Sequence, residues 1–326
     1  MKITFLGAGA WGTALAAALR SAGHAVMLWD HDRENLAVVA ATGRNEKYLP
    51  GIALPPGIAV EADAAAAARD AELVILAVPS KAFRTVAAVL RDFRGPAVTV
   101  TKGIEFASGL TMSRVLREVA PRAIPVALSG PTLALEVARG IPTAAVAASH
   151  DAAAARLVQE LFHRPSFRVY TSPDVTGVEL GGALKNVIAI GAGVCDGLGF
   201  GDNSKAALVT RAIVEMRRLG MACGANPETF SGLSGLGDLV VTCFSRLSRN
   251  RTLGERLGRG EKLADLLANS ITVAEGYPTA QAAWQLARRH DVSTPVIDEV
   301  YAMLYEGKEV AQAVRDLTSR DSKAES

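Results

Sequence analysis

Hydrophobic residues recur along the chain with two different spacings, and the spacing changes shortly after residue 172. Before that point, short runs of aliphatic and β-branched residues alternate with segments of helix length. The runs are KITFLG, AVMLW, ELVILAV, AVTVT, IPVALSG, TAAVAA and FRVYT. Strands separated by helix-length segments predict right-handed βαβ units and a parallel sheet with helices on both faces.

From about Val175 onward, apolar residues recur at intervals of three and four, as in AALVTRAIVEMRRLG and TAQAAWQLARRH. This period predicts an all-helical region. A chain of 326 residues is also too long for one ordinary core, because single cores stop growing near about 250 to 300 residues. We therefore predict two domains, residues 1–174 and residues 175–326, with a polar, frayed end at SRDSKAES.

The charge balance argues against several kinds of partner. Basic and acidic residues number 35 and 33, which leaves no basic stripe for nucleic acid and no polybasic anchor for a lipid surface. No run of about 18 uninterrupted apolar residues predicts a membrane span, and the Gly-rich start MKITFLGAGAWG is not typical of a signal peptide. We expect no metal site, because no ligand spacing such as HExxH relates the five histidines: His24, His31, His150, His163 and His290.

The cysteines indicate a reducing compartment. Cys195, Cys223 and Cys243 lie far apart in apolar contexts, and their odd number rules out a complete set of disulfides within one chain. We interpret them as reduced core residues of a cytoplasmic protein.

A glycine motif lies between the first predicted strand and the helix that follows it. Gly7, Gly9 and Gly12 reproduce the pattern G-x-G-x-x-G. In that pattern the first glycine allows a tight turn, the second admits a pyrophosphate to the backbone, and the third allows close helix packing. The second strand ends at Asp30, close to the spacing of a ribose-binding acid. The sequence therefore predicts a Rossmann-type α/β domain that binds a dinucleotide, followed by an all-α domain.

The same segment leaves the choice between NAD and NADP open. Asp30 favours NAD, because a carboxylate accepts hydrogen bonds from a ribose 2′-hydroxyl and repels a 2′-phosphate. His31 and Arg33 favour the phosphate. Pro79 and Ser80 also fall at the carboxyl edge of the sheet, but we interpret them only as a helix start capped by Ser80.

A single lysine, Lys185, stands in the apolar stretch GALKNVIAIGAG. A buried ammonium costs several kcal/mol unless it is paired or its pKa falls. Lys185 could also lie at a helix start and extend its charged end to water. If the segment is helical, Lys185 shares a face with Ala189, Ala192 and Asp196, and the small residues leave room for a ligand or for close helix packing.

Further polar residues complete a candidate site. Asp238 follows a glycine series, and Ser248, Arg249 and Asn250 together offer the donors that bind a phosphate monoester. Two loops that follow predicted strands, TKGIE and SGPTLALE, open at the carboxyl edge of the sheet. They carry Lys102, Gly130, Thr132 and Ala134.

Six segments, taken in order, resemble the bacterial NAD(P)-dependent glycerol-3-phosphate dehydrogenases over nearly the whole chain. They are GAGAWGTALA, TKGIE, SGPTLALE, GALKNVIAIGAGVCDGLGFGDNSKAALVTR, GLSGLGDLVVTC and SRNR. VAEG at 273–276 and VYAMLYEGK are also similar to this family. The resemblance implies a fold like that of 6-phosphogluconate dehydrogenase, a homodimer, and supply of glycerol 3-phosphate for glycerophospholipid synthesis.

The resemblance also implies roles for individual residues. Lys185 would be the catalytic acid and base. Independently of the resemblance, a pKa lowered by burial and by a nearby cation suits such a proton transfer, and Lys102 and Lys205 are the candidate cations. The implied substrate pocket consists of Lys102, Gly130, Thr132, Lys185, Asp238, Ser248, Arg249 and Asn250. The implied dinucleotide site adds, to the three glycines and Asp30, the residues Ala10, Trp11, His31, Lys102, Ala134, Arg249, Val273 and Glu275.

Two other functions fit parts of the pattern. A two-domain dehydrogenase acting on a hydroxy acid would need a carboxylate pocket in place of SRNR. A dinucleotide-binding sensor without catalysis would leave Lys185, Asp238 and the phosphate cluster without a purpose.

Overall fold

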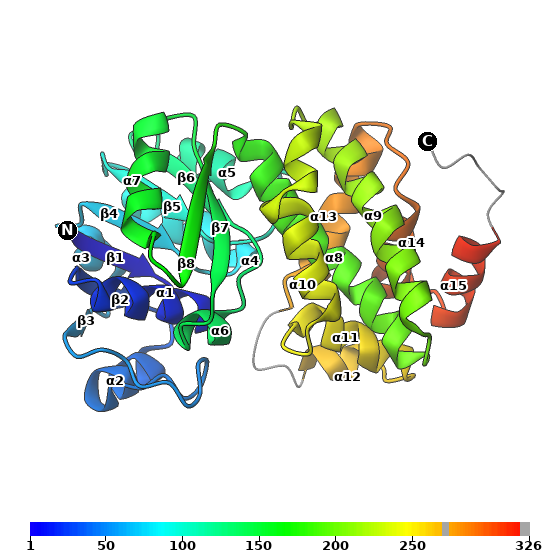
Figure 1. Ribbon diagram of the computed structural model, residues 1–326, viewed down its shortest axis with the longest axis horizontal. Helices are drawn as coiled ribbons and strands as arrows, with labels where there is room; N and C mark the ends of the chain where they lie inside the picture. The colour runs from blue at the N-terminus through cyan, green and yellow to red at the C-terminus, as the bar shows by residue number, and fades with distance from the viewer. Residues whose placement is uncertain (269–273, 320–326) are drawn as a thin grey trace.

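The computed structural model describes residues 1–268 and 274–319. A sheet with helices on both faces forms the part nearer the N-terminus, and a group of helices forms the rest (Figure 1). The last strand ends at Ser172 and the first long helix begins at Val175, where the hydrophobic spacing changes.

The sheet has eight strands in the order β3-β2-β1-β4-β5-β6-β7-β8. They are β1 (Lys2–Leu6), β2 (Ala25–Trp29), β3 (Ile58–Val60), β4 (Leu73–Leu76), β5 (Pro96–Thr99), β6 (Ile124–Ser129), β7 (Thr143–Ala148) and β8 (Phe167–Ser172). The pattern did not predict β3, which has three residues and pairs with β2 alone at the edge of the sheet. The seven predicted strands are all present.

The prediction of a wholly parallel sheet was wrong at one edge. β7 runs antiparallel to β6, and β8 runs parallel to β7. Only the five-residue helix α6 (Ala134–Ala138) lies between β6 and β7. Five helical residues rise only about 7.5 Å, whereas the six residues of β6 extend about 20 Å. The link therefore lacks a helix long enough to carry the chain back along the sheet, and β7 begins near the end of β6.

Alternating side chains of the strands supply two cores, one on each face of the sheet. On β4, Leu73 and Ile75 pack with α1 and α7, whereas Val74 and Leu76 pack with α3, α4 and α5. The helices of this part are α1 (Ala10–Ser21), α2 (Arg33–Thr42), α3 (Ala64–Ala68), α4 (Ser80–Ala87), the 3₁₀ turn Ala88–Leu90, α5 (Met112–Val119), α6 and α7 (Ala152–Phe162). α3 consists of five consecutive alanines.

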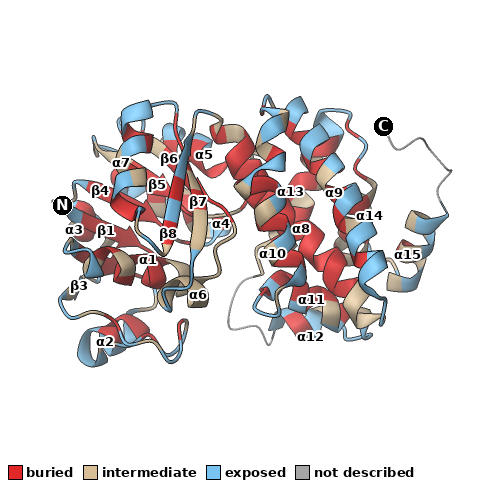
Figure 2. Cartoon of the chain, in the orientation of Figure 1, coloured by how far each residue is buried: buried red, intermediate tan, exposed pale blue. Residues whose placement is uncertain are grey.

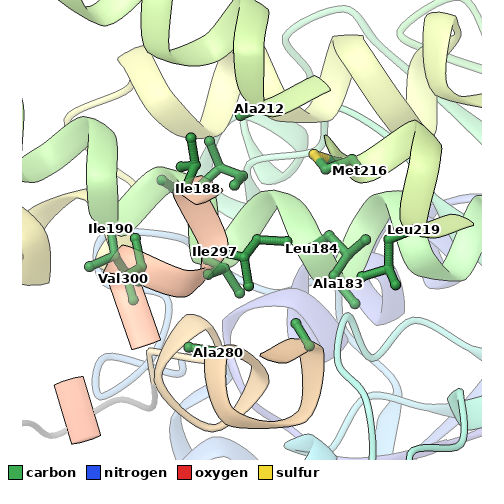
Figure 3. Packing of buried hydrophobic residues seen from close by; sticks show 14 of the residues in the cluster. Ala183, Leu184, Ile188, Ile190, Ala212, Met216, Leu219, Ala280, Ile297 and Val300 are labelled. Atoms are coloured by element: carbon green, nitrogen blue, oxygen red, sulfur yellow. The ribbon is translucent and has the colours of Figure 1, made fainter. Parts of the chain in front are cut away.

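The helical part is built around α8 (Val175–Gly197), which is buried along most of its length (Figure 2). Leu184 and Ile188 pack in one cluster with Met216 of α9 and Ile297 of α14 (Figure 3). The other elements are α9 (Asp202–Ala222), the 3₁₀ turn Pro227–Ser231, the π-helical turn Leu233–Gly237, α10 (Asp238–Phe244), α11 (Arg249–Gly258), α12 (Leu263–Ala268), α13 (Gly276–Arg289), α14 (Pro295–Tyr305) and α15 (Val310–Thr318).

Helix α8 is long and apolar enough, by composition, to cross a membrane. However, 89% of its most apolar window is buried inside the protein, so its apolar surface is already covered by its neighbours. Cys195, Cys223 and Cys243 are all free thiols, as predicted, although only Cys243 is fully buried.

Candidate active site

Lys185 lies in the middle of α8, not at a helix start, and it does not extend to water. Only 7% of the residue is exposed. Its Nζ donates to Thr242 Oγ1 at 2.7 Å and lies 3.0 Å from Asp238 Oδ1. Burial lowers the pKa of Lys185 to about 8, even though Asp238 raises it, and the positive charge of Lys102 lowers it further. Lys185 is therefore a buried, paired ammonium that can lose its proton near neutral pH.

The sheet part brings a second lysine to the same carboxylate. Lys102 Nζ lies 2.7 Å from Asp238 Oδ2, and it donates to the Gly130 carbonyl at 2.8 Å and to Thr132 Oγ1 at 3.4 Å. An ammonium has three N–H donors, so these contacts use all of them. The longest bond, to Thr132, is the one that a substrate oxygen could most easily replace. Asp238, at 1% exposure, thus joins the two parts of the chain at the site.

The other proposed neighbour of Lys185 lies elsewhere. Lys205 forms an ion pair with Asp196, near the far end of α8, and Asp196 Oδ2 also lies 2.6 Å from Arg251 Nε. Lys102, and not Lys205, is therefore the cation that acts on Lys185.

Helix α11 begins with the predicted phosphate cluster, but its three residues are used differently. Ser248 is the N-cap and accepts the N–H of Arg251 at 3.2 Å. Asn250 donates to Asn186 Oδ1 at 2.9 Å and accepts the Gly276 N–H at 2.8 Å. The Arg249 side chain is exposed. Arg249 is thus the most available charged donor for a phosphate, assisted by the free N–H groups that every helix start carries.

The glycine motif has the geometry that a dinucleotide needs. Gly7 has φ +117°, and a Cβ there would lie 2.6 Å from the Ala77 carbonyl oxygen. A Cβ on Gly12 would lie 2.1 Å from the Gly7 carbonyl oxygen. A Cβ on Gly9 would meet nothing within 4 Å, so open space adjoins the backbone where a pyrophosphate would approach. These residues fit a dinucleotide at the start of α1.

The Asp30 carboxylate binds the backbone of this glycine loop. Asp30 Oδ2 accepts the Ala8 N–H at 2.6 Å, and Oδ1 accepts the Asp32 N–H at 3.0 Å. The side chain is 8% exposed, whereas that of His31 is 82% exposed. Ala10 and Trp11 occupy the first turn of α1, and Ala134 begins α6, which packs against α1.

A contact between the two parts of the chain lies at the end of β4. Glu275 accepts the Ser80 N–H at 3.1 Å and the Ser80 hydroxyl at 2.6 Å. Burial raises the pKa of the Glu275 carboxyl. Ser80 is the first residue of α4 and not its cap, so its hydroxyl serves this contact. Val273, also predicted to line the dinucleotide, lies outside the described residues.

Sequence reasoning missed four residues of the site. Thr242 binds Lys185, Asn186 donates to the Lys102 carbonyl at 3.1 Å, Ser80 binds Glu275, and Asn45 donates to the Ala8 carbonyl at 2.8 Å. Thr242 follows Asp238 by four residues, a helical spacing that could have identified it. The other three depend on contacts across long stretches of sequence.

Comparisons with known proteins cover almost the whole chain. Residues 2–155 match the N-terminal sequence profile of NAD-dependent glycerol-3-phosphate dehydrogenase, and residues 174–315 match the C-terminal profile. A glycerol-3-phosphate dehydrogenase [NAD(P)+] of Geobacter metallireducens is 49% identical over 99% of this chain and 98% of its own. One of Prosthecochloris aestuarii is 47% identical over the full length of both.

A solved structure agrees with these sequence matches. The crystal structure of glycerol-3-phosphate dehydrogenase from Coxiella burnetii has a TM-score of 0.94 and 36% identity, and the match covers 98% of this chain and 99% of that one.

Proposed function

Because the chain belongs to the family of NAD(P)-dependent glycerol-3-phosphate dehydrogenases, we propose specific roles for the residues that surround Lys185. The protein is an oxidoreductase that interconverts sn-glycerol 3-phosphate and dihydroxyacetone phosphate, and it supplies glycerol 3-phosphate for glycerophospholipid synthesis. The bound NAD(P)(H) supplies or accepts the hydride at the C2 carbon of the substrate. The observation that carries the assignment of roles is the buried Lys185–Asp238–Lys102 arrangement.

Lys185 is the acid and base in this proposal. Two of its three N–H donors point to Thr242 and Asp238, which leaves one for the C2 oxygen of the substrate. In ketone reduction, the Lys185 N–H bond breaks as the alcohol O–H bond forms. In alcohol oxidation, the neutral amine accepts the hydroxyl proton. A pKa of about 8 suits both directions.

Asp238 and Lys102 set the charge state of Lys185. The Asp238 carboxylate lies between the two ammonium groups and stabilises both of them. Lys102 also fixes the loop that carries Gly130 and Thr132, which forms the wall of the pocket on the sheet side. The two domains, residues 1–174 and 175–326, would therefore each contribute one lysine to a common carboxylate.

The substrate phosphate would lie at the start of α11. Arg249 provides the charge, while Ser248 and Asn250 hold the helix start in place. The dinucleotide would be held by the glycine loop, with Ala10, Trp11, His31 and Ala134 on the sheet side. Lys102, which follows β5, would complete the site together with Arg249 and Glu275 of the helical part. Binding energy from the phosphate would orient the ketone for the reaction.

A substrate comparison tests the proposal. Oxidation of NADH and of NADPH is followed by absorbance, with dihydroxyacetone phosphate and with unphosphorylated dihydroxyacetone. The wild-type protein should reduce the phosphate ester far faster, and Arg249→Ala should remove most of that advantage. Arg246→Ala, which changes an exposed arginine in the preceding loop, is the matched control. If Arg249→Ala prefers the phosphate ester as strongly as Arg246→Ala does, the role of Arg249 is contradicted.

Two further properties stay predictions. We expect a homodimer, which light scattering on the purified protein would show as twice the chain mass of 34.0 kDa. We also expect the enzyme in the cytoplasm, which cell fractionation would test.

A further inference from the structure

We infer that Asp30 and Asn45 clamp the Ala8 peptide and so fix the dinucleotide loop, while Arg33 and His31 determine the choice between NAD(H) and NADP(H). Asp30 would then be a positioning residue and not the residue that selects the ribose. This inference rests on the proposed dinucleotide site and assigns a role to residues around it.

The N–H side of the clamp is the Asp30 carboxylate. Ala8 lies between Gly7 and Gly9 and is fully buried. Its N–H donates to Asp30 Oδ2 at 2.6 Å, a short, charge-assisted bond. Asp30 directly follows β2, which pairs with β1 immediately before the glycine loop. The carboxylate therefore ties the loop to the neighbouring strand.

The carbonyl side of the clamp is Asn45. Asn45 Nδ2 donates to the Ala8 carbonyl at 2.8 Å and to Thr13 Oγ1 at 2.8 Å. Thr13 itself donates to the same carbonyl at 3.0 Å. Asn45 has no exposed surface, and its own Oδ1 accepts the Asn35 amide at 3.2 Å. Both polar groups around Ala8 are thus satisfied by side chains from outside the loop, so the peptide planes beside Gly9 have one defined orientation.

These contacts leave Asp30 little capacity to bind a ribose. A carboxylate has about four acceptor positions. The N–H groups of Ala8 and Asp32 fill two acceptor positions of the Asp30 carboxylate, and His31 Nδ1 lies 2.9 Å from its Oδ1. With 8% of the side chain exposed, at most one position faces outward. A 2′-phosphate would therefore not meet a free carboxylate at Asp30.

Arg33 is an exposed cation just after the end of β2, and His31 is exposed as well. Asp32 is occupied, because its carboxylate accepts the Asn35 N–H and lies 2.6 Å from Lys47 Nζ. Glu34 is the one exposed carboxylate of the first turn of α2. A guanidinium binds phosphate by paired hydrogen bonds, so Arg33 is the residue suited to a 2′-phosphate.

The experiment measures dissociation constants of NADH and NADPH by isothermal titration calorimetry for the wild type and four variants. Asp30→Asn and Asn45→Ala disturb the clamp. Arg33→Ala removes the phosphate-binding cation, and Arg117→Ala, an exposed arginine on α5, is its matched control. Thr13→Val removes the Thr13 bond to the Ala8 carbonyl and the bond that Thr13 accepts from Asn45, but it keeps the side-chain size and the Asn45 bond to Ala8. It is the milder clamp variant if Asn45→Ala does not fold.

Asp30→Asn places an amide donor or an uncharged acceptor against the Ala8 N–H, so it should weaken both dinucleotides by about 10-fold or more. The ratio of the NADH and NADPH dissociation constants should stay within about 2-fold of the wild-type ratio. The same is expected of the Asn45 or Thr13 variant. Arg33→Ala should weaken NADPH by at least about 5-fold and leave NADH unchanged. The titration stoichiometry gives the folded fraction, so partial unfolding does not disturb the ratio.

The opposite pattern would overturn the inference. If Asp30→Asn weakens NADH alone, or tightens NADPH so that the ratio changes 10-fold or more, Asp30 selects the ribose. An unchanged ratio in Arg33→Ala would remove Arg33 from the selection. Failure of the wild type to bind either dinucleotide would instead contradict the proposed function, which keeps the two failures distinct.

Discussion

Replacing Asp238 by asparagine should shift the pH dependence of the reaction, because its carboxylate holds the proton on Lys185. Asp238 lies 3.0 Å from Lys185 and 2.7 Å from Lys102 and is almost fully buried. At 3.0 Å, two unit charges attract by about 5 kcal/mol at an effective dielectric constant of about 20. Asparagine removes this attraction and leaves the repulsion between the two lysines, so the pKa of Lys185 should fall below its value of about 8.

The expected size follows from charge pairs of this kind, which shift a pKa by about 1 to 3 units. A fall of 2 units would lower the protonated fraction of Lys185 at pH 7.5 from about three quarters to about 3%, or roughly 25-fold. Ketone reduction needs that proton, so its rate at pH 7.5 should fall by a similar factor and recover in more acidic buffer. Breaking a buried ion pair should also lower the free energy of unfolding by about 3 to 5 kcal/mol.

The assay is kcat for reduction of dihydroxyacetone phosphate between pH 5.5 and pH 9.5. Asp196→Asn is the matched control, because Asp196 also lies between two cations, Lys205 and Arg251, but does not contact Lys185. The control should lose stability and keep the wild-type midpoint. A midpoint in Asp238→Asn equal to that of the wild type would refute the account of how Asp238 acts.

Three other properties can be tested. In the wild type, kcat for ketone reduction should fall as the pH rises through about 8, because Lys185 loses the proton that it donates. The kcat for alcohol oxidation should rise over the same range, because the neutral amine of Lys185 accepts the proton. Two pH profiles that do not change in opposite directions would count against Lys185. Burial raises the pKa of Glu215, which accepts the Val296 N–H at 2.9 Å, from 4.5 to about 7. Since the folded-state value is the higher one, its contribution to stability is present below about pH 4.5 and is lost as the pH rises through about 7. The difference in unfolding free energy between wild type and Glu215→Gln, measured in urea, should therefore decline by roughly 3 kcal/mol across this range, and a constant difference would disagree. Ser80→Ala removes the hydroxyl bond to Glu275 and should weaken NADPH binding several-fold without changing the pH midpoint of kcat, whereas an unchanged dissociation constant would show that the contact is dispensable.

Local patterns of the sequence predicted most of the fold and the central residues. The period-2 and period-3.6 spacings located seven strands and the helical part, and the glycines and Lys185 carried their chemistry in their immediate context. β7 follows a helix of only five residues and runs antiparallel to β6, and the strand pattern reports neither feature. Likewise, the sequence left open whether Lys185 lies at a helix start, because its helix begins ten residues earlier in a Gly-rich stretch.

Residues that act through distant partners were harder to predict. The spacing of Asp30 from the glycine motif suggested a ribose ligand, but only the folded chain shows that its carboxylate faces Ala8. Asn45 lies 37 residues from Ala8, and Ser80 lies 195 residues from Glu275, so no local pattern relates them. Polar residues in ordinary loops acquire such roles only through the topology of the sheet.

Lys185 transfers the proton in the proposed mechanism, and two measurements on Lys185→Ala examine that role. Turnover of dihydroxyacetone phosphate is measured together with the dissociation constant of NADPH, and Lys262→Ala, at an exposed lysine, serves as the control. We expect kcat to fall by about 100-fold or more in Lys185→Ala with NADPH binding retained, and we expect wild-type behaviour in the control. Turnover near the wild-type level in Lys185→Ala would contradict that role.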